Sequence, residues 1–247
     1  MGIMQKASAP DASESIPAFA WSIRRARQVA QPAEYSPAIT DGPYRAVSIF
    51  PSLLLARLGI APNLITTAWG VLGLVGVIAL GRPQYGVRLA GALLLQMSYL
   101  LDFVDGEVAR LLNRTSDHGS FIDLVCHGLI KSSLFLAVGY GQYVYHHRAW
   151  ALLPAFVACV SLSGIYSLPF LATAAKVREQ QGSESVPRPT RSTIATLRDL
   201  LAVFPESPGL FALVLLGAAF NRLSWVLLLY GVLSPLWFLR RLLKYCG

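Results

Sequence analysis

The stretch YLLDFVDGEVARLLNRTSDHGSFIDLVCHG, residues 99–128, places acidic and basic side chains inside an otherwise apolar sequence. Asp102 and Asp105 stand three residues apart, and Asp123 and His127 stand four apart, so on helices each pair shares one face. The polar segment 113–118 is short enough to join two antiparallel helices, which brings the end of one beside the start of the next. The stretch therefore predicts one cavity, lined by these four side chains, near one end of a helix pair.

The composition of the 247 residues is that of an integral membrane protein. Hydrophobic residues make up 54% and charged residues only 14%, whereas about a quarter of the residues of a soluble domain are charged. Several apolar runs approach the roughly 20 residues that cross a bilayer as a helix. They are too long and too continuous for barrel strands, so we predict an all-α integral membrane fold.

Six transmembrane helices, preceded by an interfacial amphipathic helix, are expected along the chain. The interfacial helix is predicted over residues 44–58, where Pro51 interrupts a segment too short to span. The spans are predicted at residues 64–81, about 87–112, 119 to about 143, about 150–174, 208–220 and 223–243. Gly70, Gly73 and Gly76 in the first span suit close contact with another helix. Residues 192–204 are expected to form a surface helix or the start of the fifth span, which is the shortest.

The chain before the membrane domain is expected to lack a fixed structure. Residues 1–42 are rich in Pro, Ser, Ala and Gln and show no sustained apolar period, so we predict a flexible cytoplasmic tail and, over residues 43–247, the six-span domain. The tail's basic cluster, Arg24, Arg25 and Arg27, either contacts anionic lipid headgroups or is a solvated run of charge.

The basic residues predict how the chain is oriented. The net charge is +8, and most Lys and Arg residues fall in segments that a six-span topology with a cytoplasmic amino terminus places inside, as the positive-inside rule requires. This asymmetry explains the charge without nucleic acid, so the expected surroundings are a lipid bilayer. It also places the 99–128 cluster on the cytoplasmic side of the cytoplasmic membrane.

Ionisable side chains at membrane depth are costly, and by default they mark a functional site. Carboxylates without thiolates suit Mg²⁺ or Mn²⁺, and two such ions can clamp a phosphoryl or pyrophosphate group. Gly106 and Ala109 leave room for a flat group against the helix backbone, and Arg110 can pair with phosphate or carboxylate. The residues alone leave open metal-assisted phosphoryl transfer, ion or proton transport, and a structural network in which the aspartates pair with Arg110 and Lys131.

The stretch resembles the signature of the CDP-alcohol phosphotransferase family of membrane enzymes, Asp-x2-Asp-Gly-x2-Ala-Arg-x8-Gly-x3-Asp-x3-Asp. The matching positions are Asp102, Asp105, Gly106, Ala109, Arg110, Gly119 and Asp123. Pro62, Asn63 and Thr66 are similar to the family's amino-terminal pattern. The resemblance implies transfer of a substituted phosphate from CDP-diacylglycerol or another CDP-alcohol to an alcohol or phospho-alcohol acceptor, with release of CMP. It also implies two divalent ions, Mg²⁺ or Mn²⁺, and a homodimer.

The resemblance also implies roles, position by position. The implied metal ligands are Asp102, Asp105, Asp123 and His127. The residues implied near the CDP donor are Asn63, Thr66, Gly106, Ala109, Arg110 and Gly119. The basic residues that are candidates for binding a phosphate of acceptor or donor are Lys131, Lys176, Arg178 and Arg191, and for these a structural or topological role is the alternative.

One position departs from the family pattern, because its last aspartate falls on His127. The resemblance assigns that aspartate to metal binding and to deprotonation of the acceptor hydroxyl. Histidine can act as a base near neutral pH and can bind one ion through one nitrogen, but it cannot bridge two ions. Three outcomes are open: an active enzyme with His127 as the base, an impaired or inactive family member, or compensation by Asp117. An ion-coupled transporter or a membrane scaffold is the alternative from another class.

Overall fold

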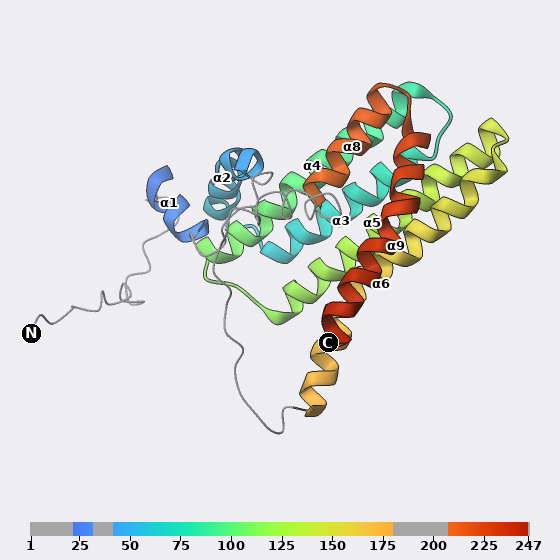
Figure 1. Cartoon of the computed structure of the whole chain (residues 1–247). Coiled ribbons are helices and arrows are strands. Elements are labelled where there is room, and N and C mark those ends of the chain that lie inside the picture. The colour runs from blue at the N-terminus through green and yellow to red at the C-terminus, as the bar shows by residue number, and fades with distance from the viewer. Residues whose placement is uncertain (1–21, 32–41, 180–206, 247) are drawn as a thin grey trace, which may run out of the picture.

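The computed structural model describes residues 22–31, 42–179 and 207–246, and these residues form helices and the connections between them (Figure 1). The helices are α1 (Ile23–Ala30), α2 (Gly42–Arg57), α3 (Pro62–Leu80), α4 (Tyr85–Leu111), α5 (Asp117–His146), the short 3₁₀-helix η2 (Ala149–Ala151), α6 (Leu152–Glu179), α8 (Ser207–Ala219) and α9 (Leu223–Cys246). The prediction of an all-α fold is confirmed for this part of the chain.

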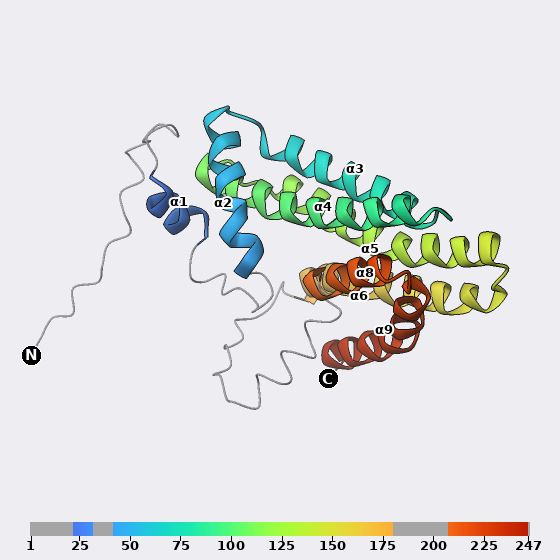
Figure 2. The ribbon, with the colours of Figure 1, turned by 90° about the horizontal axis from the view of Figure 1, so that it is seen from above.

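The long helices form an antiparallel bundle. The turns between α3 and α4, α5 and α6, and α8 and α9 lie at one end of it, at the right of Figure 2, and the connection from α4 to α5 lies toward the other end, as do α1 and α2. Side chains such as Trp69, Leu95, Phe135 and Tyr230 fill the main core between the long helices. A second core joins α1 and α2 to the last turns of α4, so the two short helices pack against the segment that carries the acidic motif.

Within the described ranges, five helices are long and apolar enough to cross a membrane: Pro62–Leu80, Tyr85–Leu111, Gly119–His146, Ala149–Leu168 and Leu223–Leu243. They correspond to the predicted first to fourth and sixth spans, and the chain is a multi-pass membrane protein. The predicted fifth span corresponds to α8, whose 13 residues cover about 20 Å at 1.5 Å per residue, less than the hydrocarbon core of about 30 Å. A sixth crossing and an interfacial position for α2 stay predictions.

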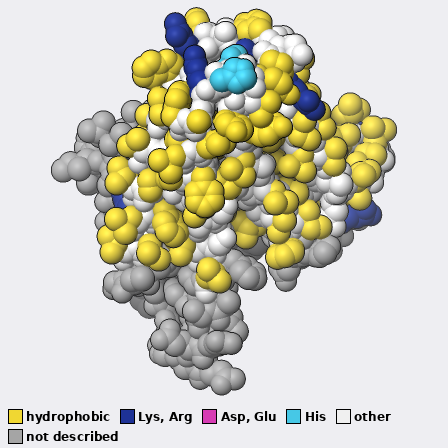
Figure 3. All heavy atoms as spheres, turned by 90° about the vertical axis from the view of Figure 1, so that its right-hand side faces the viewer, with side chains coloured by type: hydrophobic (Ala, Val, Ile, Leu, Met, Phe, Trp, Pro, Cys, Tyr) yellow, Lys and Arg dark blue, Asp and Glu magenta, His cyan; other side chains and the backbone are white. Residues whose placement is uncertain are grey.

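The outer surface of the bundle is apolar. Leu153, Phe156, Phe220 and Val232 are each more than 60% exposed. Seen from the side of the α5–α6 turn, hydrophobic side chains cover most of the described surface, and only a few basic and histidine side chains interrupt them (Figure 3). Exposed apolar surface of this extent is what a lipid-facing bundle presents.

Helix α1 lies within the segment for which the sequence predicts a flexible tail. The Ser22 hydroxyl accepts a hydrogen bond from the backbone N–H of Arg25 at 3.3 Å and caps the helix. Ala26 and Ala30 are completely buried. The helix was not predicted, because its apolar positions recur over only eight residues and its buried side chains are the small ones of alanine. The remainder of the predicted tail, and the predicted helix at 192–204, lie outside the described residues.

Helices α3 and α4 approach most closely through two glycines. A Cβ atom at Gly91 would lie 2.7 Å from the carbonyl oxygen of Gly76, and one at Gly76 would lie 2.9 Å from the carbonyl oxygen of Gly91. Both distances are shorter than real Cβ contacts, and the obstacle in each case is backbone. The close contact predicted for the glycines of the first span is confirmed at Gly76.

Replacement of Gly91 by alanine is therefore expected to push α3 and α4 apart and to lower the stability of the solubilised protein by about 1–3 kcal/mol, as overpacking does elsewhere. The midpoint of thermal unfolding in detergent measures this effect. Gly86→Ala, on the same helix, is the matched control because nothing lies within 4 Å of a Cβ atom at Gly86. An equal loss in both variants would contradict the steric explanation.

Candidate active site

The connection between α4 and α5 sets the geometry of the site. Asn113 follows α4 with φ of 51°, in the left-handed region that asparagine tolerates, and the backbone N–H of Arg114 donates to the carbonyl of Ala109 at 2.8 Å. The Ser116 hydroxyl then caps α5 by accepting from the N–H of Gly119 at 3.1 Å. This short turn returns α5 alongside the bundle, as the sequence predicts.

Three side chains from α4 and α5 meet in what we call the acidic cluster: Asp102, Asp123 and His127. The His127 Nε2 atom lies 3.1 Å from Oδ1 of Asp102 and 3.6 Å from Oδ1 of Asp123. One potential ligand atom from each residue lies within 4.8 Å of the other two. The Trp69 ring packs against the imidazole with 5.0 Å between ring centroids. The structure thus brings together three of the four predicted metal ligands.

Asp105, the fourth predicted ligand, is held by α3. Its Oδ2 atom accepts a hydrogen bond from the Thr66 hydroxyl at 2.7 Å and another from the Trp69 indole N–H at 2.8 Å. Thr66, which the resemblance places near the donor, therefore supports a carboxylate directly. The role of Trp69 was missed, and nothing in the sequence distinguishes it from the other tryptophans because its partner lies 36 residues away on another helix.

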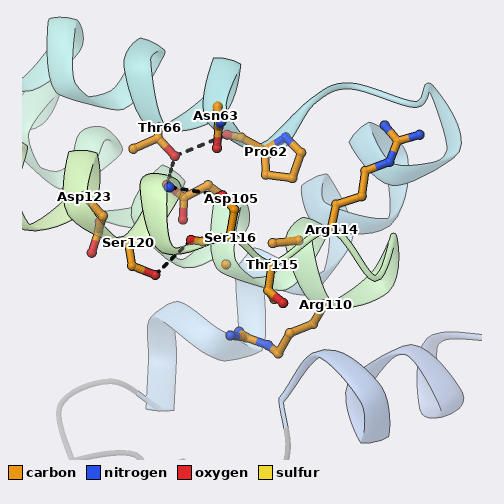
Figure 4. A pocket seen from close by; sticks show the side chains of 13 residues that line it. Pro62, Asn63, Thr66, Asp105, Arg110, Arg114, Thr115, Ser116, Ser120 and Asp123 are labelled. Atoms are coloured by element: carbon orange, nitrogen blue, oxygen red, sulfur yellow. Dashed lines mark hydrogen bonds between the residues drawn. The ribbon is translucent and has the colours of Figure 1, made fainter.

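A pocket of about 390 Å³ opens between α3, α4 and α5 beside the acidic cluster (Figure 4). Its lining residues are Pro62, Asn63, Thr66, Asp105, Gly106, Ala109, Arg110, Arg114, Thr115, Ser116, Gly119, Ser120 and Asp123. All six residues that the resemblance places near the CDP donor are among them, together with two carboxylates. The volume falls in the range of small-molecule sites.

At the two motif glycines, neighbouring side chains lie close to the backbone that lines this pocket. A Cβ atom at Gly119 would lie 3.0 Å from the Asn63 side-chain oxygen and 3.2 Å from the Ser116 hydroxyl, so any larger residue there would have to displace these side chains. A Cβ atom at Gly106 would lie 3.4 Å from the Arg110 guanidinium. The space over Gly106 is therefore bounded by a positive charge.

Comparison with known proteins agrees with this geometry. The family model described as CDP-alcohol phosphatidyltransferase matches residues 59–237, a range that contains both the acidic cluster and the pocket. The chain belongs to the CDP-alcohol phosphatidyltransferase family. The chain is thus a transferase, and both the resemblance and the prediction of an enzyme are confirmed.

A solved relative of this phosphatidyltransferase shares its fold. The crystal structure of Mycobacterium tuberculosis phosphatidylinositol phosphate synthase (PgsA1) with CDP-DAG bound matches with a TM-score of 0.58 and 19% sequence identity. The match covers 85% of this chain and 94% of that chain. No curated protein sequence matches the chain significantly.

The family uses divalent metal ions, and the residues of this phosphatidyltransferase fit such an ion. Asp123 Oδ1 is buried and has no hydrogen-bond partner among the described residues, although a buried carboxylate oxygen normally has one. Three carboxylates lie in or beside the acidic cluster, and oxygen donors of this kind suit Mg²⁺ and Mn²⁺.

The candidate phosphate-binding residues are less closely tied to the site. Lys131 is buried, and its ammonium group donates to the Tyr166 hydroxyl at 2.7 Å, so it has a partner on α6. Lys176 and Arg178 belong to α6, but their side chains lie outside the described part of the chain, as does Arg191. The structure therefore adds no support for phosphate binding by these residues.

Glu107, inside the motif, was missed by the sequence analysis. It is 1% exposed. Its Oε1 accepts hydrogen bonds from the Ser48 hydroxyl at 2.6 Å and the Gln31 amide at 2.7 Å, and its Oε2 accepts one from the Ser52 hydroxyl at 2.6 Å. The carboxyl group thus joins α4 to both α1 and α2. The available signal was an acidic residue at membrane depth.

Replacing Glu107 by alanine is expected to destabilise the protein by about 3 kcal/mol, because two buried serine hydroxyls and the part-buried Gln31 amide lose an acceptor and a cavity remains. The unfolding midpoint in detergent tests this expectation. Glu107→Gln, which keeps the shape and one acceptor oxygen, should lose less. An alanine variant as stable as the parent would show that the three hydrogen bonds contribute little.

Proposed function

We propose that this phosphatidyltransferase moves a substituted phosphate from a CDP-linked donor to an alcohol acceptor, with release of CMP, in a reaction that depends on a divalent metal ion. The observation that carries the proposal is the pocket beside the acidic cluster, because it gathers the implied donor residues of three helices next to the carboxylates. The printed description of the M. tuberculosis relative names CDP-DAG as its ligand, so CDP-diacylglycerol is the first donor to test.

In the proposed site, Asp102, Asp105 and Asp123 hold the ion, and Gly106, Ala109 and Arg110 accommodate the CDP part of the donor. A bound divalent ion supplies positive charge that neutralises the pyrophosphate oxygens and stabilises the leaving group. The Arg110 guanidinium adds a further charge on the same side of the pocket.

His127 is proposed as the base. The family pattern assigns this position to both metal binding and proton transfer, and the Nε2 atom faces both carboxylates of the acidic cluster. An imidazole nitrogen has one lone pair, so Nε2 cannot hold an ion and accept a proton at the same time. We assign it to the proton, because Asp102 at 3.1 Å can stabilise the imidazolium that forms.

The reaction balances with these groups. The acceptor hydroxyl gives its proton to His127, and its oxygen bonds to the phosphorus that carries the alcohol part of the donor. The bond from that phosphorus to the oxygen shared with the cytidylyl phosphate breaks, and CMP leaves with the electron pair. His127 then releases the proton to water.

The membrane location of the enzyme is proposed from its distribution of basic residues, and its oligomeric state from the family resemblance. The excess of Lys and Arg at the motif end of the spans supports a cytoplasmic membrane location, with the pocket open to the cytoplasm where nucleotide-activated substrates occur. We also propose the homodimer that the family resemblance implies. Crosslinking in native membranes tests the dimer, and labelling of a cysteine introduced at Arg114 tests the side.

The deciding experiment measures CMP release by the purified full chain across a panel of donors and acceptors, with and without Mg²⁺ or Mn²⁺. We expect release that requires a donor, an acceptor and a divalent ion together. Transfer that continues unchanged in excess chelator would contradict the metal requirement. If the folded protein released no CMP with any donor, this result would support the alternative that the chain is an impaired or inactive member of the family.

A further inference from the structure

Glu107 has no part in the proposed reaction, yet its carboxyl group lies buried at the motif end of the bundle, where an unneeded carboxyl is costly. We propose that Glu107 is a positioning residue: it docks α1 so that the last residue of α1 holds Arg110 over the donor pocket, and it thereby sets the affinity for the nucleotide part of the donor. The inference rests on the proposed function in one respect, namely that the pocket takes a cytidine nucleotide.

Helix α1 is held against α2 and α4 through Gln31. The Gln31 amide nitrogen donates both to Glu107 Oε1 and to the carbonyl oxygen of Arg45, each at 2.7 Å. One side chain at the end of α1 therefore contacts α4 and α2 together. The Arg27 guanidinium adds a contact to the carbonyl of Ala46 at 3.2 Å. Without Glu107, the amide would lose the partner that fixes it to the motif helix.

The docked end of α1 contacts a residue that lines the pocket. The residue before Gln31 is Ala30, and its carbonyl oxygen accepts a hydrogen bond from Arg110 Nε at 2.6 Å. Bonding through Nε fixes the plane of the guanidinium, and with it the direction of its two terminal nitrogens. These nitrogens lie 3.4 and 3.5 Å from the position of a Cβ atom at Gly106, on the pocket wall.

The orientation of Arg110 affects how tightly the donor binds. A guanidinium that is already oriented loses less conformational freedom when it binds phosphate than one that must be ordered by the ligand. Glu107 and Gln31 therefore act on donor affinity through Arg110, without contact with the donor. The acceptor hydroxyl and His127 are not part of this chain of contacts, so turnover at saturating donor should change little.

The test uses CMP binding to the purified full chain in detergent, measured by calorimetry with Mn²⁺ present, and the kinetic constants for donor and acceptor. Gln31→Ala and Glu107→Ala are expected to raise the Kd for CMP and the KM for the CDP donor about tenfold, the equivalent of about 1.4 kcal/mol. The kcat and the KM for the acceptor should stay within about twofold. Gln31→Ala keeps the test usable where Glu107 variants do not fold.

Gln96→Ala is the matched control. Gln96 is also a glutamine with two partners on other helices, since it accepts from the Tyr44 hydroxyl and donates to the Phe211 carbonyl, and both partners pack with the main core. It should leave the Kd for CMP unchanged. If the parent binds CMP and the Kd values of Gln31→Ala and Glu107→Ala lie within twofold of the parent value, this inference alone is overturned. An equal weakening by Gln96→Ala does the same, and a folded parent that binds no cytidine nucleotide overturns the proposed function as well.

Discussion

Replacing Asp123 by asparagine is expected to reduce CMP release about a thousandfold. The change keeps the shape of the side chain but removes the charge from an oxygen that is buried and has no hydrogen-bond partner among the described residues. Loss of several kcal/mol of charge stabilisation at a metal site corresponds to about three powers of ten in rate. Initial rates with saturating donor and acceptor, across a series of Mg²⁺ and Mn²⁺ concentrations, measure the effect.

Added Mg²⁺ or Mn²⁺ should restore the activity of Asp123→Asn only in part, because the missing charge also helps to place the ion. Asp105→Asn should behave alike, although Thr66 and Trp69 already donate to one of its oxygens and keep the side chain in place. The unfolding midpoint of each variant should stay near that of the parent. If Asp123→Asn were as active as the parent at low metal concentration, Asp123 would not be a metal ligand.

His127→Ala is expected to lower kcat by about 10²–10⁴, the usual contribution of a positioned general base. Because we assign the Nε2 lone pair to the proton and not to the ion, the dissociation constants for Mn²⁺ and for CMP should stay within about twofold of the parent values. Single-turnover transfer measures the role of His127 as a base. Titration with Mn²⁺, followed by the electron paramagnetic resonance spectrum of the ion, measures any role as a metal ligand. The purification tag has to be removed first, because its histidines bind metal.

A large loss of Mn²⁺ affinity in His127→Ala would mean that Nε2 is an ion ligand and that the base lies elsewhere. Transfer at the parent rate would show that no base is needed at this position. His127→Asp should keep or raise activity, since the family pattern has aspartate there. His146→Ala is the control, as it removes an exposed histidine at the far end of the same helix and should change neither rate nor metal affinity.

The sequence predicts the site well where the contacts are local. Asp102, Asp123 and His127 lie on two helices joined by a short turn, so helical periodicity and the turn alone bring them together. The ends of the apolar runs likewise predict the long helices to within a few residues, because a membrane-spanning helix shows its length directly in its hydropathy.

Contacts between distant segments are the part that the sequence does not reveal. Trp69 and Asp105 meet because α3 packs on α4, and Glu107 meets Gln31 because α1 folds back over a separation of 76 residues. The periodic signal of α1 extends over only eight residues, too few to be recognised in a segment rich in Pro, Ser and Gln. For α8, the apolar run correctly predicts a helix, but the run is shorter than the length that crosses a bilayer, so it does not predict by itself that α8 spans the membrane.

The contact between Trp69 and His127 gives the site an optical reporter. The indole ring packs on the imidazole and donates its N–H to Asp105, so its emission depends on the charge and position of two site residues. The chain has 5 tryptophans, and subtracting the spectrum of Trp69→Phe isolates this one. Occupancy of the pocket can therefore be followed by fluorescence in the intact protein, without a labelled substrate.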